Sequence, residues 1–173
     1  MLLAMALGSC AGRPTPARPV PDTVQWNDAA TQEARAQVER TMGAFASMDL
    51  EGFKAGLAEG VVAFEIDMEG KPVRLASRDE AARFAAETFA LLKKMGASAK
   101  LDIHSSDCHA ISMLAYCTVE FDFNARMADG STMSQPTRNS VVLRKGDDGW
   151  KWTHWHSSLA VLPASPAQGK APR

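Results

Sequence analysis

The amino-acid sequence predicts a single α+β domain in which a curved antiparallel sheet packs against N-terminal helices. Three observations carry this prediction. Up to Gly96, apolar residues mostly recur every three to four positions, as in amphipathic helices. After Gly96 they alternate with polar residues, as in half-buried strands. About 140 residues lie between a Pro-rich N-terminal stretch and an Ala/Pro-rich tail, which is the usual size of one domain with one core.

The composition is that of a globular protein with balanced charge. Hydrophobic residues make up 46% of the chain and charged residues 23%, with 19 basic against 20 acidic side chains. No cluster of basic residues indicates nucleic-acid binding, and no apolar run approaches the roughly 20 residues that a membrane-spanning helix needs. The sequence contains no cofactor-binding motif, so no cofactor is expected.

The N-terminus combines a short apolar stretch, small residues, a cysteine and a Pro-rich run. An apolar stretch ends in Leu7-Gly8-Ser9-Cys10, and four prolines follow before Asp22. The Leu-Gly-Ser-Cys run resembles the signal-peptidase box of bacterial lipoproteins, which implies a signal segment over 1–9, a lipidated Cys10 and a stiff tether over 10–24. The domain, over 25–162, would then be anchored in the bacterial cell envelope, facing the periplasm or the exterior.

The same N-terminus leaves other readings open. Only nine residues precede Cys10 and none of them is basic, unlike the basic start of a typical signal peptide. Either translation starts upstream of Met1, or the segment is an apolar tail and the protein is cytoplasmic. Plain secretion without lipid is a third reading.

Three helices are expected, over 27–46, 49–57 and 77–96. Asp49 can cap the second helix by accepting hydrogen bonds from free backbone amides of the first turn, and Gly60 is expected to end that segment. Ser77 and Glu80 form a capping-box pattern at the start of the third helix, and Gly96 stops it.

Strands are expected over 61–67, 72–75, 99–108, 114–126, 131–145 and 150–161, and the last four form an antiparallel meander. In the strand over 114–126, Cys117, Val119, Phe121 and Phe123 share one face, and polar residues share the other. The helices must therefore cover the apolar face. The tail over 163–173 is predicted to be disordered.

Cys108 and Cys117 flank a predicted hairpin turn near Ser112-Met113. If the turn is centred there, residues whose numbers sum to 225 face each other, so the two thiols are cross-strand neighbours. A disulfide between them is one expectation, and two buried free cysteines are the alternative.

The order of the elements and two local segments resemble a known family. Gly149-Trp150-Lys151-Trp152-Thr153-His154-Trp155-His156-Ser157-Ser158 and the strand over 138–145 resemble the closing strands of the SnoaL-like branch of the nuclear transport factor 2-like (NTF2-like) superfamily, which also includes the ketosteroid isomerases. The resemblance covers about 27–162. It implies a cone-shaped domain, with its curved sheet wrapped around the helices, a pocket at the open end and a homodimer formed through the outer sheet face.

His154 and His156 are the first candidates for a site, because alternation along one strand points both imidazoles to the same face. They could exchange protons near neutral pH or bind an anionic or carbonyl group, or they could line a pocket without chemistry. A metal would need a third ligand such as His104, His109, Glu65 or Asp67. No spacing fixes one, so no metal is expected.

Asp67, Arg138 and Trp152 complete the candidate set. Asp67 could act as a general base, or it could belong only to the turn at Glu69-Gly70. Arg138 could bind an acidic ligand or lie in solvent, and Trp152 could stack on a flat ligand or be a wall residue. Tyr116 lies on the polar face of its strand and is expected outside the pocket.

The function expected from these residues is a pocket for an unknown small apolar or aromatic molecule, with His154 and His156 as polar anchors. One alternative is an isomerase or dehydratase that moves a proton next to a carbonyl. The other is a partner-binding or dimerisation module without chemistry.

Overall fold

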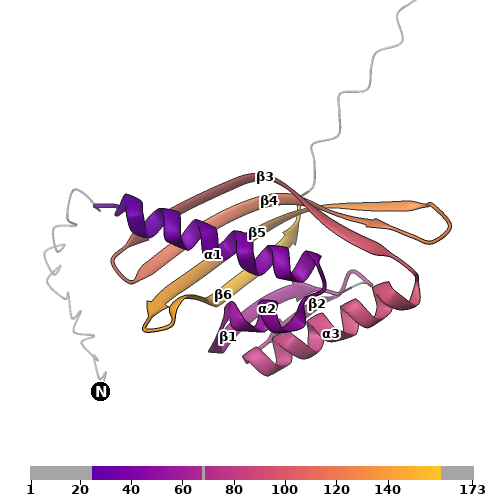
Figure 1. Ribbon diagram of the computed structural model, residues 1–173, viewed down its shortest axis with the longest axis horizontal. Coiled ribbons are helices and arrows are strands. Elements are labelled where there is room, and N and C mark those ends of the chain that lie inside the picture. Colours follow the sequence, from indigo (N-terminus) through magenta and orange to yellow (C-terminus); the bar gives the residue numbers. More distant parts are fainter. Residues whose placement is uncertain (1–24, 68, 161–173) are drawn as a thin grey trace, which may run out of the picture.

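The computed structural model describes residues 25–67 and 69–160, and shows three helices packed against one curved sheet (Figure 1). The helices are α1 (Asp28–Ala46), α2 (Leu50–Ala55) and α3 (Arg78–Lys94). The strands are β1 (Leu57–Ile66), β2 (Pro72–Leu75), β3 (Ser98–Ile111), β4 (Leu114–Arg126), β5 (Thr132–Gly146) and β6 (Gly149–Leu159). The predicted signal segment over 1–9, the tether over 10–24 with Cys10, and the tail over 163–173 all lie outside the described residues.

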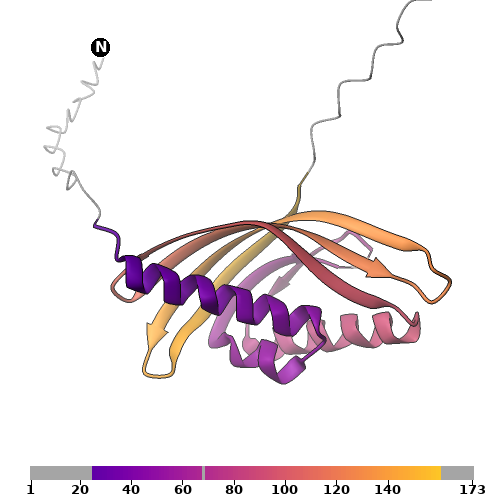
Figure 2. The same ribbon diagram turned by 45° about the horizontal axis from the view of Figure 1, so that its top comes forward.

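The six strands form an open sheet in the order β2-β1-β6-β5-β4-β3. The last four strands are an antiparallel meander, as predicted, and β1 joins β6 in a parallel pair. Figure 2 shows the sheet bending strongly over the helices, with α1 along its concave side. The side chains of alternate residues therefore point either into this concave side or onto the outer face.

Each helix begins at a side-chain cap that the sequence contains. Asn27 accepts a hydrogen bond from the amide of Ala30 at 2.9 Å, and Asp49 accepts one from Gly52 at 3.0 Å. Ser77 accepts one from Glu80 at 3.2 Å.

None of the described helices is long and apolar enough to cross a membrane.

The second predicted helix is too long by a few residues. The structure ends α2 at Ala55, and Leu57 already pairs with Trp152 of β6, so β1 begins four residues before the predicted start at Val61. Gly60 lies inside the strand, where the register between β1 and β6 shifts. Glycine is tolerated there because an irregular pairing needs little side-chain packing.

The core lies between the concave face and the helices. Val38 of α1, Leu92 of α3 and Leu143 of β5 are fully buried in it. The predicted inward series of β4, from Cys117 to Phe123, is buried as expected. Tyr116 is exposed on the outer face.

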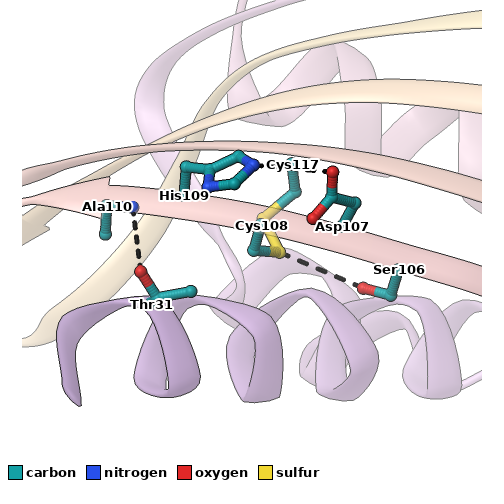
Figure 3. The surroundings of a disulfide bond; sticks show 7 residues. All are labelled: Thr31, Ser106, Asp107, Cys108, His109, Ala110 and Cys117. Carbon is teal, nitrogen blue, oxygen red and sulfur yellow. Dashed lines mark hydrogen bonds and ion pairs between the residues drawn. A yellow bond between two sulfur atoms is a disulfide. The ribbon is translucent and has the colours of Figure 1, made fainter. Parts of the chain in front are cut away.

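A disulfide joins β3 to β4 within their hairpin, on the side that faces α1 (Figure 3). Cys108 pairs with Cys117 in the strand register, and their sulfur atoms are bonded. Next to them, the amide of Ala110 donates to the hydroxyl of Thr31 at 3.0 Å, and the amide of Asn27 donates to the carbonyl of Ala110 at 2.8 Å. These two contacts hold the first turn of α1 on the hairpin, and the disulfide joins the two strands of the hairpin to each other.

Replacing Cys108 and Cys117 together by Ala should lower the free energy of unfolding by about 2 to 3 kcal/mol, because the bridge restricts the unfolded chain. Urea unfolding followed by circular dichroism measures this. A reductant should destabilise the parent by a similar amount and leave the double variant unchanged. Equal stability of parent and variant would contradict a stabilising bridge.

Candidate functional site

The concave side of the sheet holds a cavity with a volume of about 120 Å³. Its walls come from all three helices and from every strand except β2. Most of the lining is aromatic or aliphatic. The aromatic residues are Phe45, Phe53, Phe84, Phe121, Phe123, Trp152 and Trp155. Exposed Leu159 and half-buried Asp67 and Gln135 also line it, which places its mouth at the ends of β6, β1 and β5.

A bulge in β6 decides which side chains reach this cavity. Leu143 pairs with Trp152, but the neighbouring Val142 pairs with His154, so Thr153 is an extra residue in the ladder. The hydroxyl of Thr153 donates to the carbonyl of Val142 at 3.1 Å. As a result, Trp152 and Trp155 are both buried on the concave side although they are three residues apart.

The same bulge places His154 and His156 on the outer face. Their rings lie 6.0 and 6.3 Å from the ring of exposed Phe64, measured between centroids. Neither histidine lines the cavity. The structure keeps the two predicted histidines together, as alternation requires, but on the opposite side of the sheet from the cavity.

Glu65 is the ionisable residue that lies on the inner face of β1, whereas Asp67 lies near the mouth of the cavity. Val61 and Ala63 are fully buried on the inner face of β1, and alternation puts Glu65 next on that face. Glu65 lines the cavity and is only partly exposed, and we attribute that exposure to the cavity itself. The pattern in the sequence that indicates this position is that Glu65 follows Val61 and Ala63 at two-residue spacing along one strand.

Three donors converge on the Glu65 carboxyl group. Its Oε1 accepts a hydrogen bond from the hydroxyl of Ser157 at 2.7 Å and another from the indole Nε1 of Trp155. Its Oε2 accepts from the amide of Ile66 at 3.3 Å. Two of the three donor residues sit on β6, so the bulge that turns Trp155 inward also builds this hydrogen-bonding environment.

Burial raises the pKa of Glu65 above its ordinary value of 4.5. The loss of water around the carboxylate is the largest effect. The hydrogen bonds from Ser157, Trp155 and Ile66, and the nearby charge of His156, act in the opposite direction without cancelling it. The carboxyl group therefore holds its proton more tightly than a glutamate in water does.

The other predicted site residues lie in two places. Trp152 is buried in the cavity wall, and Asp67 lines the cavity near its mouth. The Oδ1 of Asp67 also accepts from the amides of Glu69 at 2.9 Å and Lys71 at 2.8 Å, so it shapes the turn to β2. Arg138 is exposed on the outer face and donates to Glu120, with its Nη2 at 2.6 Å.

A polar strip runs beside Glu65 along the cavity. Gln135, Thr137 and Asn139 of β5 line it together with Ser157, which pairs with Asn139 in the register. Asn139 is 7% exposed, and its Oδ1 has no hydrogen-bond partner. The indole nitrogen of Trp152 also lacks a partner. Unpaired buried polar atoms cost stability, so this part of the wall can gain from a ligand.

The described residues contain no group of three or more His, Cys, Asp or Glu side chains that could hold a metal ion. His104 pairs with Asp122 at 3.0 Å, and the ring of His109 packs on Trp26, with the centroids 4.9 Å apart. Neither of them lines the cavity with Glu65 or Asp67.

The raised pKa of Glu65 should make folding less favourable as the pH rises. The unfolded chain releases the proton near pH 4.5 and the folded protein releases it at higher pH, so stability falls between these two values. Glu65→Gln keeps an acceptor for Ser157 and Trp155 but cannot ionise. We expect it to become increasingly more stable than the parent as the pH rises from 4.5.

Urea unfolding of both proteins at matched pH values measures this difference. Glu33, Asp102 and Asp129, whose pKa values are lowered, affect parent and variant equally. A constant difference across the pH range would show that Glu65 does not titrate abnormally.

Comparison with known proteins agrees with this architecture. A structure of an NTF2-like protein of unknown function from Pseudomonas putida KT2440 is 20% identical, with a TM-score of 0.66, and the match covers 86% of this chain and 96% of that one. A putative dehydratase from Streptomyces avermitilis is 17% identical, with a TM-score of 0.67, covering 78% and 99%. A ketosteroid isomerase-like protein from Erwinia carotovora atroseptica SCRI1043 is 16% identical, with a TM-score of 0.60, covering 79% and 100%.

At these identities the three structures establish the fold alone. No curated protein matches the chain in sequence. The expected homodimer stays a prediction. The model of the SnoaL-like domain family matches residues 34–162, which is most of the described domain. The chain therefore belongs to the SnoaL-like domain family and has the NTF2-like fold.

Proposed function

We propose that the protein binds a small apolar or aromatic molecule in the cavity between the sheet and the helices. The observation that carries this proposal is an aromatic-lined cavity in which a partly buried carboxyl group, Glu65, is held by Ser157 and Trp155. Ligand sites in proteins are mostly apolar concave spaces with a few placed polar groups, and this cavity has that composition.

The size of the cavity limits the part of a ligand that it encloses. A closed apolar cavity of about 150 Å³ can hold a benzene molecule. The volume of about 120 Å³ found here suits a single ring, and any further part of the ligand would extend past Asp67 and Leu159 at the mouth.

Thermal unfolding of the full chain against a panel of ring compounds tests this proposal. At one hundred times its Kd, a ligand should raise the Tm by roughly 5 to 10 °C. Thr137→Phe, which fills the cavity from β5, should abolish the shift. A variant with both His154→Ala and His156→Ala should retain it, because these rings lie on the outer face.

The histidine variant also distinguishes binding in the cavity from the binding at His154 and His156 that the sequence led us to expect. A shift that survives Thr137→Phe and disappears in the histidine variant would move the site to the outer face and contradict the cavity proposal.

A second candidate function is proton transfer next to a carbonyl group. Glutamates that act as general bases are tuned upward toward neutral pH by burial, and burial raises the pKa of Glu65 in this way. The Glu65 carboxylate would take the proton from the carbon beside a bound carbonyl, leaving the electron pair in an enolate. The same group would then return the proton to a carbon of the product.

Exchange of carbon-bound hydrogen for deuterium in a ketone that binds the cavity measures this chemistry by nuclear magnetic resonance. Glu65→Gln should slow the exchange by about 10²- to 10⁴-fold, because the general base is removed. Glu59→Gln, at an exposed position of the same strand, is the matched control. Equal exchange with the parent and Glu65→Gln would exclude Glu65 as the base.

We also propose that the chain is exported and lipidated at Cys10. The disulfide between Cys108 and Cys117 supports export, because structural disulfides persist in oxidising compartments. Mass spectrometry of the native protein should find lipid on Cys10 and no free thiol at the other two cysteines. A soluble form with all three thiols free would contradict export.

A further inference from the structure

The ionisable residues around the cavity are all acidic. The helices contribute Met42, Phe45, Phe53, Phe84 and Thr88 to the lining, and none of these titrates. Strands β3 to β6 contribute apolar or neutral polar side chains, β1 contributes Glu65 and Ile66, and Asp67 follows directly after β1. No Lys, Arg or His is present among the described residues that line the cavity. A carboxylate or phosphate ligand would therefore meet two carboxyl groups and no positive charge.

The Glu65 carboxyl group accepts hydrogen bonds that suit its ionised form, but among the described residues no positively charged side chain lies beside it in the cavity. Ser157, Trp155 and Ile66 all donate to it, which favours its ionised form. His156 is the basic side chain whose charge lowers the pKa of Glu65, and it lies across the sheet rather than in the cavity. Burial of the charge without a partner inside the cavity opposes ionisation. A positively charged group in the cavity would stabilise the ionised form of Glu65 and offset the cost of burying its charge.

Two further features suit a positive group that carries N–H donors. The faces of aromatic rings attract cations, and Trp155 and its aromatic neighbours form much of the wall. The Oδ1 of Asn139 is a buried acceptor without a donor, and Asn139 lies opposite Ser157, which itself bonds to Glu65. An ammonium group near Glu65 could therefore also supply the hydrogen bond that Asn139 lacks.

We propose that the ligand is an organic amine, protonated in solution, whose ammonium group pairs with Glu65 beside Asn139 while its apolar or aromatic body lies against the ring wall. This inference rests on the proposed binding function and names its ligand class. It excludes organic anions, and it ranks neutral molecules of the same shape below amines.

Calorimetric titration of the full chain with three matched compounds tests the charge preference. The compounds are 2-phenylethylamine, 2-phenylethanol and 3-phenylpropanoate, which carry similar bodies with a positive, neutral and negative end. The amine should bind at least about tenfold more tightly than the alcohol, because it adds a charged hydrogen bond and ring contacts. The carboxylate should show no measurable binding.

Variants then assign the preference to Glu65. Glu65→Gln should reduce the affinity for the amine by about tenfold or more and that for the alcohol by a much smaller factor, because only the amine loses a charged partner. Glu59→Gln, exposed on the same strand, should change neither. If Glu65→Gln fails to fold, titration of the parent in buffers of different ionisation enthalpy still tests the pairing. Amine binding below the raised pKa of Glu65 should release protons, and alcohol binding should not.

The outcomes separate this inference from the proposed function. Binding of the alcohol as tightly as the amine, or an amine affinity that Glu65→Gln does not change, would overturn the amine class and leave the binding function standing. Absence of proton release on amine binding would also overturn it. If none of the three compounds binds, and indole and naphthalene analogues with the same ends do not bind either, both the ligand class and the binding function fall.

Discussion

The site depends on one extra residue in the central part of the sheet. Strand β6 lies between β1 and β5, so its inward side chains form the middle of the concave wall. Thr153 is the bulge residue, and it allows Trp152 and Trp155 to point the same way. Without the bulge, regular alternation would turn Trp155 and Ser157 onto the outer face, and Glu65 would lose two of its donors.

The bulge also explains which part of the site could be predicted from the sequence. Period and capping residues located the helices and strands, because those signals are local. The position of Cys108 opposite Cys117 followed from one turn centre. The face of the sheet to which Trp155, His154 and His156 point depends on whether the strand pairing of β6 is regular. No local residue pattern predicts a bulge at Thr153.

The environment of Glu65 is a second feature that the sequence of a single strand does not predict. Its phase with Val61 and Ala63 placed it on the apolar face, which was visible in the sequence. Its role depends on Ser157 and Trp155, which are about ninety residues away in the chain. A carboxylate on an apolar face is costly by itself, and the sequence does not show which distant donors compensate for it. Only the parallel pairing of β1 with β6 brings them together.

The two ends of α1 have different roles. Its first turn is fixed to the β3–β4 hairpin by the contacts of Asn27 and Thr31, next to the disulfide. Its last turns contribute Met42 and Phe45 to the cavity, and the ring of Phe45 packs against Phe53 of α2 and Phe89 of α3. The hydrogen bonds that attach α1 to the hairpin therefore lie at the opposite end of the helix from the cavity that holds the carboxyl group of Glu65 and the unpaired amide oxygen of Asn139. Burying Glu65 and Asn139 costs stability, and both residues line the cavity wall, where contact with a ligand can offset that cost.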